Sequence, residues 1–379
     1  MKSQLQGTSR ENRMRYIKAI FDRLAVELAR LKQVWVPALQ TPIAHTTLMR
    51  GEQTMSKLFT EGHAIIIGVG HDLPNTVDDA EGLAEILRDK ERCAYPAKQV
   101  RLLTGENATR DKIIAALQVM AESATADSSV IVYFSGHGYR VKTTIGTSYF
   151  LMPYGYDVKE LAETAISGRE FADLLKAIKS QKLLLLLDCC HAGGFDDAKT
   201  VGLTLTKAPL PPEAQALLAE GNGRVVIASS QEDELSYAGK PYSAFTLALI
   251  EALNGSGAAK KDGYVRVTDL ALYTREMVPK RTQDKQHPIL DFKQADNSVV
   301  AYYAAGDTEP KGLPFEGKPQ LELEPGALTP IDVDIRFYQP NMKVEGDQYV
   351  AGGDMVFNNP KPRRRRSTAG RKPVTGTQE

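Results

Sequence analysis

The sequence predicts an α/β protein in which a mostly parallel six-stranded sheet is sandwiched by helices. The first observation is Leu183–Leu187, five consecutive leucines that are too few for a membrane span and too apolar for an exposed strand. Such a run predicts a strand buried on both faces. Ser129–Phe134 is a second apolar, β-branched run of the same kind. The third observation is that such strands alternate with helical patterns throughout residues 64–303, which is typical of parallel sheets covered by helices.

The remaining elements follow in a regular order. The other four strands are predicted at residues 64–69, 99–103, 224–229 and 298–303. Helices are predicted at residues 76–90, 110–121, 168–180, 242–253 and 267–278. Thr109 is a candidate N-cap for the helix that follows it, and residues 148–152 are a short extended piece. Phe195–Gly223 is long and poorly patterned, so we expect a functional or mobile loop there.

The regions outside the sheet form separate pieces. Residues 1–62 are predicted to be an N-terminal helical segment, and a helix that docks on the main domain is favoured over a prodomain or adaptor-binding helix. Residues 63–306 form the main domain. Residues 307–357 are predicted to be a small β appendage, because Ile331–Phe337 alternates between apolar and polar residues. Residues 358–379 are predicted to be a disordered basic tail.

Composition and charge narrow the function classes. Hydrophobic residues make up 42% and charged residues 25% of the chain, as in ordinary globular proteins. The net charge is zero, which argues against nucleic-acid binding by the whole protein. The tail, with Arg363–Arg366, could bind nucleic acid only non-specifically, since it has no aromatic residue for base stacking. Cys93, Cys189 and Cys190 do not suggest a disulfide scaffold, and no apolar leader or membrane-length run occurs, so we expect a cytoplasmic protein.

Polar and reactive residues follow the two most apolar strands. The leucine run continues into Asp-Cys-Cys-His at 188–191, and the other strand continues into Ser-Gly-His-Gly at 135–138. Carboxyl ends of parallel strands meet at one edge of a sheet, so neighbouring strands would bring a base and a thiol together. His137 would favour the thiolate and later protonate the leaving amine. The backbone N–H groups of Gly138 and Cys190 are candidate donors to the oxyanion.

Two other chemistries fit less well. A zinc site is disfavoured, because adjacent residues cannot readily all bind one metal and no CxxC or HxxxH pattern occurs elsewhere, so we expect no metal. A serine hydrolase is disfavoured because no G-x-S-x-G elbow follows a strand. A single buried Cys or His is usually structural. Here a Cys and a His each follow a buried strand, and this joint pattern favours a catalytic role over a structural one.

The segments Tyr133–Gly138 and Asp188–Gly193 resemble the two signature motifs of the caspase/metacaspase clan. They are most similar to those of metacaspases and their bacterial relatives, cysteine peptidases of clan CD. The resemblance covers roughly residues 64–305 and implies a caspase–haemoglobinase-like fold. It also implies that the nucleophile is the cysteine directly before the motif histidine, Cys190, while Cys189 takes a variable position.

The resemblance further indicates the substrate class. Animal caspases hold an acidic P1 side chain with arginines, whereas His71–Glu81 contains no Arg or Lys. By resemblance to metacaspases, Asp79 and Asp188 would line an acidic S1 pocket, with Ser135 near its wall. Such a pocket suits Arg or Lys. An alternative role for Asp79 is to stabilise the first turn of a helix through the helix dipole.

We therefore expect a cysteine endopeptidase that cleaves after Arg or Lys and is a regulated zymogen. The candidate self-cleavage sites are Arg50, Lys199 and Lys207. The alternative is a catalytically idle caspase-like scaffold. The presence of both the Cys and the His argues against this alternative. The resemblance fits a bacterial defence or cell-death protease, with protein substrates and a regulatory or activating protein as partners. No cofactor is expected. Many metacaspases require calcium, yet no compact oxygen-ligand loop occurs here, so calcium activation stays open.

Overall fold

The structure is a computed structural model that describes residues 57–143, 146–189, 199–200, 203–207, 212–231, 234–292, 295–324 and 326–331. Several predictions fall outside these residues: the N-terminal helix, the site at Arg50, the position of Cys190, the alternating strand beyond residue 331 and the basic tail.

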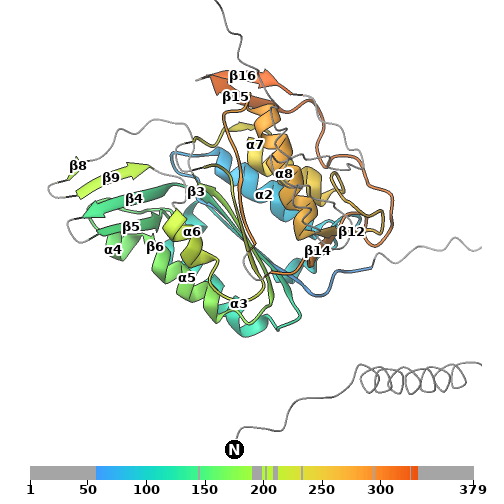
Figure 1. Ribbon diagram of the computed structural model, residues 1–379, viewed down its shortest axis with the longest axis horizontal. Helices are drawn as coiled ribbons and strands as arrows, with labels where there is room; N and C mark the ends of the chain where they lie inside the picture. Colours follow the sequence, from blue (N-terminus) through green and yellow to red (C-terminus); the bar gives the residue numbers. More distant parts are fainter. Residues whose placement is uncertain are drawn as a thin grey trace, which may run out of the picture. The chain divides into compact units, whose positions relative to one another are not determined.

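A six-stranded sheet forms the centre of the molecule, which confirms the predicted α/β architecture (Figure 1). Its strand order is β13-β10-β7-β3-β1-β2, and all neighbours are parallel except β13, which runs antiparallel to β10. The strands are β1 (Gly62–Gly68), β2 (Val100–Thr104), β3 (Ser129–Gly136), β7 (Lys182–Cys189), β10 (Arg224–Ala228) and β13 (Ile289–Asp291). The two strands that carry the candidate motifs, β3 and β7, are therefore neighbours.

The sixth strand differs from the prediction. Residues 298–303 were expected to complete the sheet, but β14 (Val299–Tyr302) instead pairs with β12 (Tyr264–Arg266) in a separate two-stranded sheet. The edge next to β10 is taken by β13, which is three residues long. Three residues are too few to show a periodic pattern, so the sequence did not indicate this strand.

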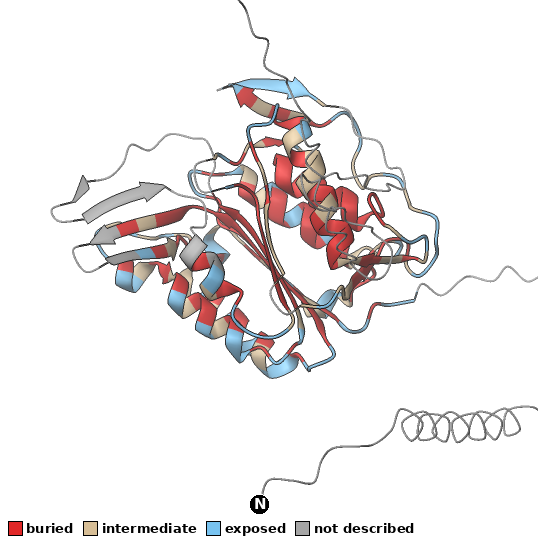
Figure 2. Ribbon diagram, viewed as in Figure 1, coloured by how far each residue is buried: buried red, intermediate tan, exposed pale blue. Residues whose placement is uncertain are grey.

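Helices cover both faces of the central sheet (Figure 1). On one face lie α2 (Asn75–Arg88), α7 (Ala244–Leu253) and α8 (Val267–Arg281), and on the other α3 (Arg110–Ser123), α5 (Gly168–Ala177) and α6 (Pro212–Leu218). The leucines of β7 alternate between the two cores: Leu184 and Leu186 pack on the α2/α7/α8 side, and the other three pack on the α3/α5/α6 side. Figure 2 shows the central strands buried between the helical layers, as expected for a run of apolar residues without alternation.

A second sheet extends from the carboxyl end of β3. Its order is β6-β5-β4-β9-β8, with β4 (Gly138–Thr143), β5 (Gly146–Leu151), β6 (Ile166–Ser167), β8 (Lys199–Thr200) and β9 (Leu203–Lys207), and α4 (Leu161–Thr164) precedes β6. Phe195–Gly223 was expected to be a functional or mobile loop, and the structure places β8, β9 and α6 within this segment. Because β9 pairs with β4, a partner about 60 residues earlier in the chain, no local pattern reveals it.

A third sheet joins the main domain to residues beyond 306. Its order is β11-β15-β16, with β11 (Gly239–Lys240), β15 (Gln320–Glu324) and β16 (Ala327–Pro330). Leu321 and Leu323 of β15 belong to the same hydrophobic core as α2 and α7. The described part of the predicted β appendage thus packs directly on the main domain.

Two serine residues cap helices through their side chains. Ser167 accepts a hydrogen bond from the Glu170 backbone N–H at the start of α5, over 3.1 Å. Ser243 accepts one from the Thr246 N–H at the start of α7, also over 3.1 Å. Thr109 occupies the N-cap position of α3 as predicted, but its side chain makes no capping hydrogen bond.

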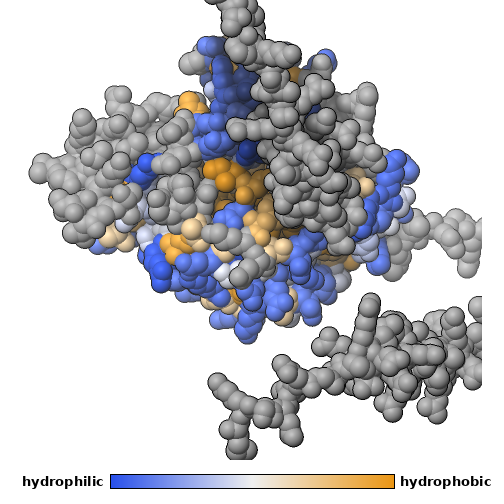
Figure 3. Space-filling view, viewed as in Figure 1, coloured by the Kyte–Doolittle hydropathy of each residue, from blue (hydrophilic) through white to orange (hydrophobic). Residues whose placement is uncertain are grey.

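On the face shown in Figure 3, the coloured part of the surface is mainly hydrophilic. On the face shown in Figure 3, hydrophobic residues gather near the middle, and hydrophilic residues surround them. Among the described residues, the exposed large hydrophobic side chains are Leu58, Val119, Leu235 and Leu328, which lie in different parts of the sequence. Among the described helices, none has the length and apolar character needed to span a bilayer.

Candidate active site

The ends of β3 and β7 bring the two candidate motifs together. Gly136 of β3 is the register partner of Cys189 of β7. His137 follows β3 directly, and in the sequence Cys190 is the residue after Cys189, the last residue of β7. Cys190 itself lies outside the described residues.

His137 is almost fully buried, with a side chain that is 3% exposed. Its backbone carbonyl accepts a hydrogen bond from Met152 N–H over 3.0 Å. Its ring Nε2 lies 2.7 Å from Oδ2 of Asp72, a residue to which the sequence had given no role. An ionised carboxylate only accepts hydrogen bonds, so Nε2 carries the proton and Nδ1 is the ring nitrogen that can accept another. The ring is therefore in the form that a general base requires.

Cys189, the last residue of β7, lies in an apolar environment. Its side chain packs in the core on the α3/α5 side of the sheet and is 3% exposed. Burial raises the pKa of its thiol to about 12, so it stays protonated at neutral pH. A buried, protonated thiol is a poor nucleophile, which fits a structural role for Cys189.

A row of polar residues crosses the same sheet edge. Ser135 of β3 is the register partner of Asp188 of β7, and the N–H of Ser229, directly after β10, donates to the Leu187 carbonyl over 2.8 Å. Side chains in register on parallel strands point to the same face of the sheet. Two residues earlier on each strand, Tyr133 and Leu186 face α2 and α7, so Ser135 and Asp188 face those helices as well.

The two predicted pocket carboxylates, Asp79 and Asp188, are linked through Ser243. Asp79 of α2 accepts a hydrogen bond from the Ser243 backbone N–H over 2.7 Å. Asp188 accepts one from the Ser243 hydroxyl over 2.8 Å and another from the Ser236 hydroxyl over 2.6 Å. Both carboxylates have no exposed surface. The structure thus brings together Asp79, Asp188 and the neighbouring Ser135.

The cluster contains a buried carboxylate oxygen that is unsatisfied. Oδ2 of Asp79 is buried and has no hydrogen-bond partner within the described part of the chain. Burial, and then the nearby charge of Asp188, raise the pKa of Asp79 well above its ordinary value. A buried carboxylate oxygen without a partner is costly, and a cation beside it would remove much of that cost. The cluster therefore suits a positively charged group.

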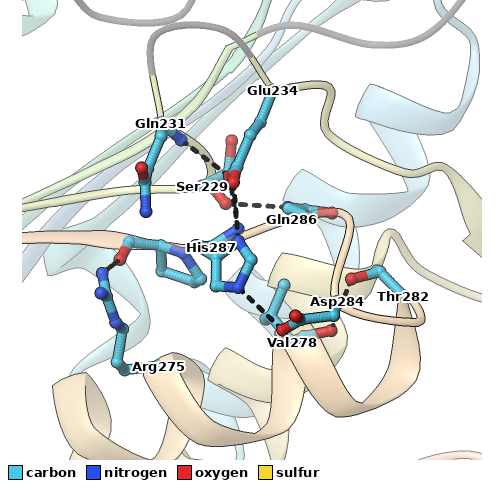
Figure 4. A network of polar contacts seen from close by, with 10 residues as sticks. Ser229, Gln231, Glu234, Arg275, Val278, Thr282, Asp284, Gln286 and His287 are labelled. Carbon is cyan, nitrogen blue, oxygen red and sulfur yellow. Dashed lines mark hydrogen bonds and ion pairs between the residues drawn. The ribbon is translucent and has the colours of Figure 1, made fainter. Parts of the chain in front are cut away.

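A network of side chains behind the cluster holds the segment after β10 (Figure 4). Gln286 donates from Nε2 to the Ser229 carbonyl over 2.9 Å and to the Ser236 hydroxyl over 3.2 Å. Its Oε1 accepts from the Tyr237 N–H over 3.0 Å. Because the Ser236 hydroxyl in turn donates to Asp188, Gln286 helps to hold the Asp188 carboxylate in place through Ser236. Gln286 and Ser236 were not recognised from the sequence.

His287, beside Gln286, ties the same segment to the end of α8. Its Nδ1 lies 2.6 Å from Oε1 of Glu234 and its Nε2 lies 2.9 Å from Oδ1 of Asp284 (Figure 4). Partial burial acts to lower the pKa of His287, but the two carboxylates outweigh it and the pKa is raised. The protonated ring can donate to both carboxylates at once.

The remaining predicted residues fall as follows. Gly138 is the first residue of β4 and follows His137 directly. Lys199 lies in β8 and Lys207 in β9. Within the described part of the chain, no three His, Cys, Asp or Glu side chains are grouped so that they could hold a metal ion.

Comparisons with known proteins show the family to which the chain belongs. Residues 61–299, more than half of the chain, match the peptidase C14 family model described as the caspase domain. A probable protease of a Desulfuromonadales bacterium is 24% identical over 247 residues, which are 58% of this chain and 30% of that protein. The chain thus spans less than a third of the curated relative that it matches.

Two solved structures show weaker similarity. A Geobacter sulfurreducens protein solved in a structural-genomics programme is 17% identical, with a TM-score of 0.43 over 64% of this chain and 98% of that one. The structure of pro-sf-caspase-1 is 15% identical, with a TM-score of 0.37 over 62% of this chain and 92% of that one.

Proposed function

The chain belongs to the caspase-domain family of peptidases, and from this premise we propose that it is a cysteine endopeptidase that cleaves proteins after Arg or Lys. Cys190 is the nucleophile and His137 the general base of a Cys–His dyad. Protein substrates follow from the peptidase family, and the basic P1 residue follows from the acidic cluster.

The unsatisfied carboxylate of Asp79 is the observation that carries the specificity. Asp79 and Asp188 are joined through Ser243 at the carboxyl edge of the sheet, the edge at which the dyad strands end. An acidic P1 side chain would meet like charges there, whereas a guanidinium or ammonium group would donate to the free oxygen of Asp79. Ser135 lies beside Asp188 in register and adds a neutral polar group to the wall.

The proposed reaction has two stages. His137 Nδ1 takes the proton from the Cys190 thiol, and the thiolate attacks the scissile carbonyl carbon. The N–H groups of Gly138 and Cys190 receive the oxyanion of the tetrahedral intermediate. When the C–N bond breaks, the amine leaves with the proton from His137, and a thioester remains. A water molecule then gives its proton to His137 and attacks the thioester, which releases the acid and restores the thiol.

We propose that the enzyme is made as a zymogen and cleaves itself. Lys199 is the favoured site, because β8 is the edge strand of its sheet. Lys207 lies in β9, which pairs on both sides, so a cut there requires β9 to separate from β4. Arg50 is a further candidate outside the described residues. A cytoplasmic role in bacterial defence or cell death, with an activating protein and with calcium as an optional activator, belongs to the same proposal.

Hydrolysis of fluorogenic peptides that end in Arg, Lys or Asp tests this function. The wild type should cleave the Arg and Lys peptides and leave the Asp peptide intact. Cys190→Ala should abolish cleavage, while Cys189→Ala should retain it. Equal rates for wild type and Cys190→Ala would instead support the alternative of a catalytically idle scaffold.

A further inference from the structure

We propose that Asp72 is the positioning residue of this site. Its carboxylate holds the His137 ring through Nε2 and stabilises the imidazolium that forms when His137 takes the thiol proton. The inference rests on the proposed function and adds a third side chain to the proposed dyad. It starts from the 2.7 Å contact between Asp72 Oδ2 and His137 Nε2.

A tight turn after β1 fixes the position of Asp72. Leu73 N–H donates to the Gly70 carbonyl over 3.1 Å, and so closes the turn that carries Asp72. The buried hydroxyl of Thr76 accepts from Gly70 N–H and donates to the Leu73 carbonyl, each over 2.8 Å. Gly70 has a φ of 69°, which glycine adopts without strain. One buried side chain therefore braces both ends of the turn.

The turn is also fixed relative to the strand that carries His137. Val69 N–H donates to the Ser135 carbonyl over 3.0 Å, which joins the ends of β1 and β3. A side chain at Gly68 could not fit, because its Cβ would lie 2.2 Å from the Thr76 carbonyl oxygen. The first turn of α2 therefore packs directly against β1. Asp72 and His137 are held by backbone on both sides, as a preorganised pair requires.

The surroundings favour a lasting interaction. The Asp72 side chain is 24% exposed and the His137 side chain 3%, so the contact is partly shielded from water. The other carboxylate oxygen, Oδ1, lies 3.6 Å from Nδ1 of His71, which is 61% exposed. Tyr139 packs edge-on to the His137 ring, and the pKa of Tyr156 is raised by its burial and then by Asp72. Asp72 is thus the acid in hydrogen-bond contact with this ring among the described residues.

This placement has a chemical consequence. With Nε2–H donated to Asp72, the proton from the Cys190 thiol can go only to Nδ1. The imidazolium then carries a positive charge next to the Asp72 carboxylate, and that pairing favours the thiolate–imidazolium state over the neutral pair. Asp72 itself gains no proton, and no bond to it forms or breaks.

The test measures the rate of Cys190 alkylation by iodoacetamide between pH 5 and pH 9, read by mass spectrometry on the full chain. The isosteric, neutral variant Asp72→Asn should alkylate at least about tenfold more slowly at pH 6.5, with its midpoint moved towards that of an ordinary thiol. Asp72→Ala should do the same. Asp78→Asn removes the same charge at an exposed position nearby and should match the wild type.

A second set of variants separates positioning from a merely structural role. In a His137→Ala background, Asp72→Asn should change nothing further, because Asp72 acts through that ring. With an Arg-ended peptide, Asp72→Asn should lower kcat and leave KM within about twofold. A wild-type alkylation profile in Asp72→Asn would overturn the inference. So would an equal loss in the His137→Ala background. Since alkylation needs no peptide, these outcomes stay readable even if the proposed P1 specificity is wrong.

Discussion

Ser243, the N-cap of α7, donates its hydroxyl to the Asp188 carboxylate over 2.8 Å at the end of β7. The same oxygen accepts the capping hydrogen bond from Thr246 N–H. One hydroxyl therefore caps a helix and orients a proposed pocket carboxylate, so that the helix start and the position of Asp188 depend on the same atom.

Ser243→Ala should raise KM for Arg-ended peptides and also destabilise the fold. Loss of a cap costs about 1 kcal/mol in unfolding free energy. Ser167→Ala is the control, because Ser167 caps α5 over the same distance and α5 packs on the opposite face of the sheet from α7. Denaturant unfolding should show a loss for both variants, larger for Ser243→Ala because the buried Asp188 carboxylate also loses a donor. Steady-state kinetics should show a raised KM for Ser243→Ala alone. A raised KM in both variants would contradict the assigned link.

The affinity for a basic P1 residue should increase as the pH rises. The pKa of Asp79 is raised by burial and by Asp188, so at low pH its carboxyl group is neutral and cannot pair with a cation. KM for an Arg-ended peptide should therefore fall as the pH rises through that raised pKa. Asp79→Asn should have a high KM that lacks this pH dependence. A KM profile of the same shape in wild type and Asp79→Asn would show that another group is responsible.

Asp79 should affect stability in the opposite sense. A carboxyl group with a raised pKa stabilises the fold fully below its ordinary pKa and loses that contribution as the pH rises through the raised value. In the absence of peptide, the unfolding free energy of the wild type should fall over this range more steeply than that of Asp79→Asn. Urea titrations at a series of pH values measure the difference. A protein more stable at high pH than Asp79→Asn would argue against the buried, unpaired carboxyl group.

Arg281 should be essential for stability. It donates to both carboxylate oxygens of buried Glu251, over 2.8 and 2.6 Å, where α8 packs on α7. Arg281→Met leaves the buried Glu251 carboxylate without its cation, while the Tyr273 hydroxyl still donates to it, and should cost about 3–5 kcal/mol. The neighbouring Lys280 makes an exposed ion pair with Glu276, so Lys280→Met should cost less than about 1 kcal/mol. Equal losses in chemical denaturation would contradict this difference.

His287 should make the fold more stable under mildly acidic conditions. Its pKa is raised, because Glu234 and Asp284 outweigh the effect of burial. The stabilisation is complete below the ordinary imidazole pKa of about 6.5 and is lost as the pH rises through the raised value. His287→Gln should remove this part of the pH dependence. His63 is the opposite control, since burial lowers its pKa and its replacement should change the slope in the other direction.

Self-cleavage should occur after Lys199 before it occurs after Lys207. The first lies in an edge strand, whereas the second lies in a strand with neighbours on both sides. Mass spectrometry of the active protein over time should detect the Lys199 terminus first, and Cys190→Ala should remain uncut. An active chain without either cut would rule out obligatory processing at these sites.

Most of the central sheet could be predicted, because five of its six strands are apolar runs that are visible in the local sequence. The strands β1, β2, β3, β7 and β10 were each expected within about two residues of their observed bounds. The missed strands depend on partners elsewhere: β13 and β8 are short, and β9 is defined by its pairing with β4. A pairing between distant segments leaves no mark on the local pattern.

The site shows the same division. The resemblance led to Asp79, Ser135 and Asp188, and the structure brings these three together. The sequence did not indicate Ser243, because Ser243 lies 164 residues from Asp79 along the chain. Its backbone N–H nevertheless donates directly to the Asp79 carboxylate. Asp72 stands in a short acidic segment in which nothing distinguishes it from its neighbours. Its contact with His137 arises only when the ends of β1 and β3 meet.

The leucines of β7 pack in both hydrophobic cores, so the leucine run does not by itself determine which residue of the strand faces which core. If one leucine were inserted or removed between Leu183 and Leu187, the strand would still place leucine against leucine on both faces. Everything after the run would rotate to the opposite side, however, and Asp188 would then face α5 while Cys189 faced α7. The polar residues at the two ends of β7 therefore determine the register of the strand. We expect a one-residue length change there to abolish activity in a protein that still folds.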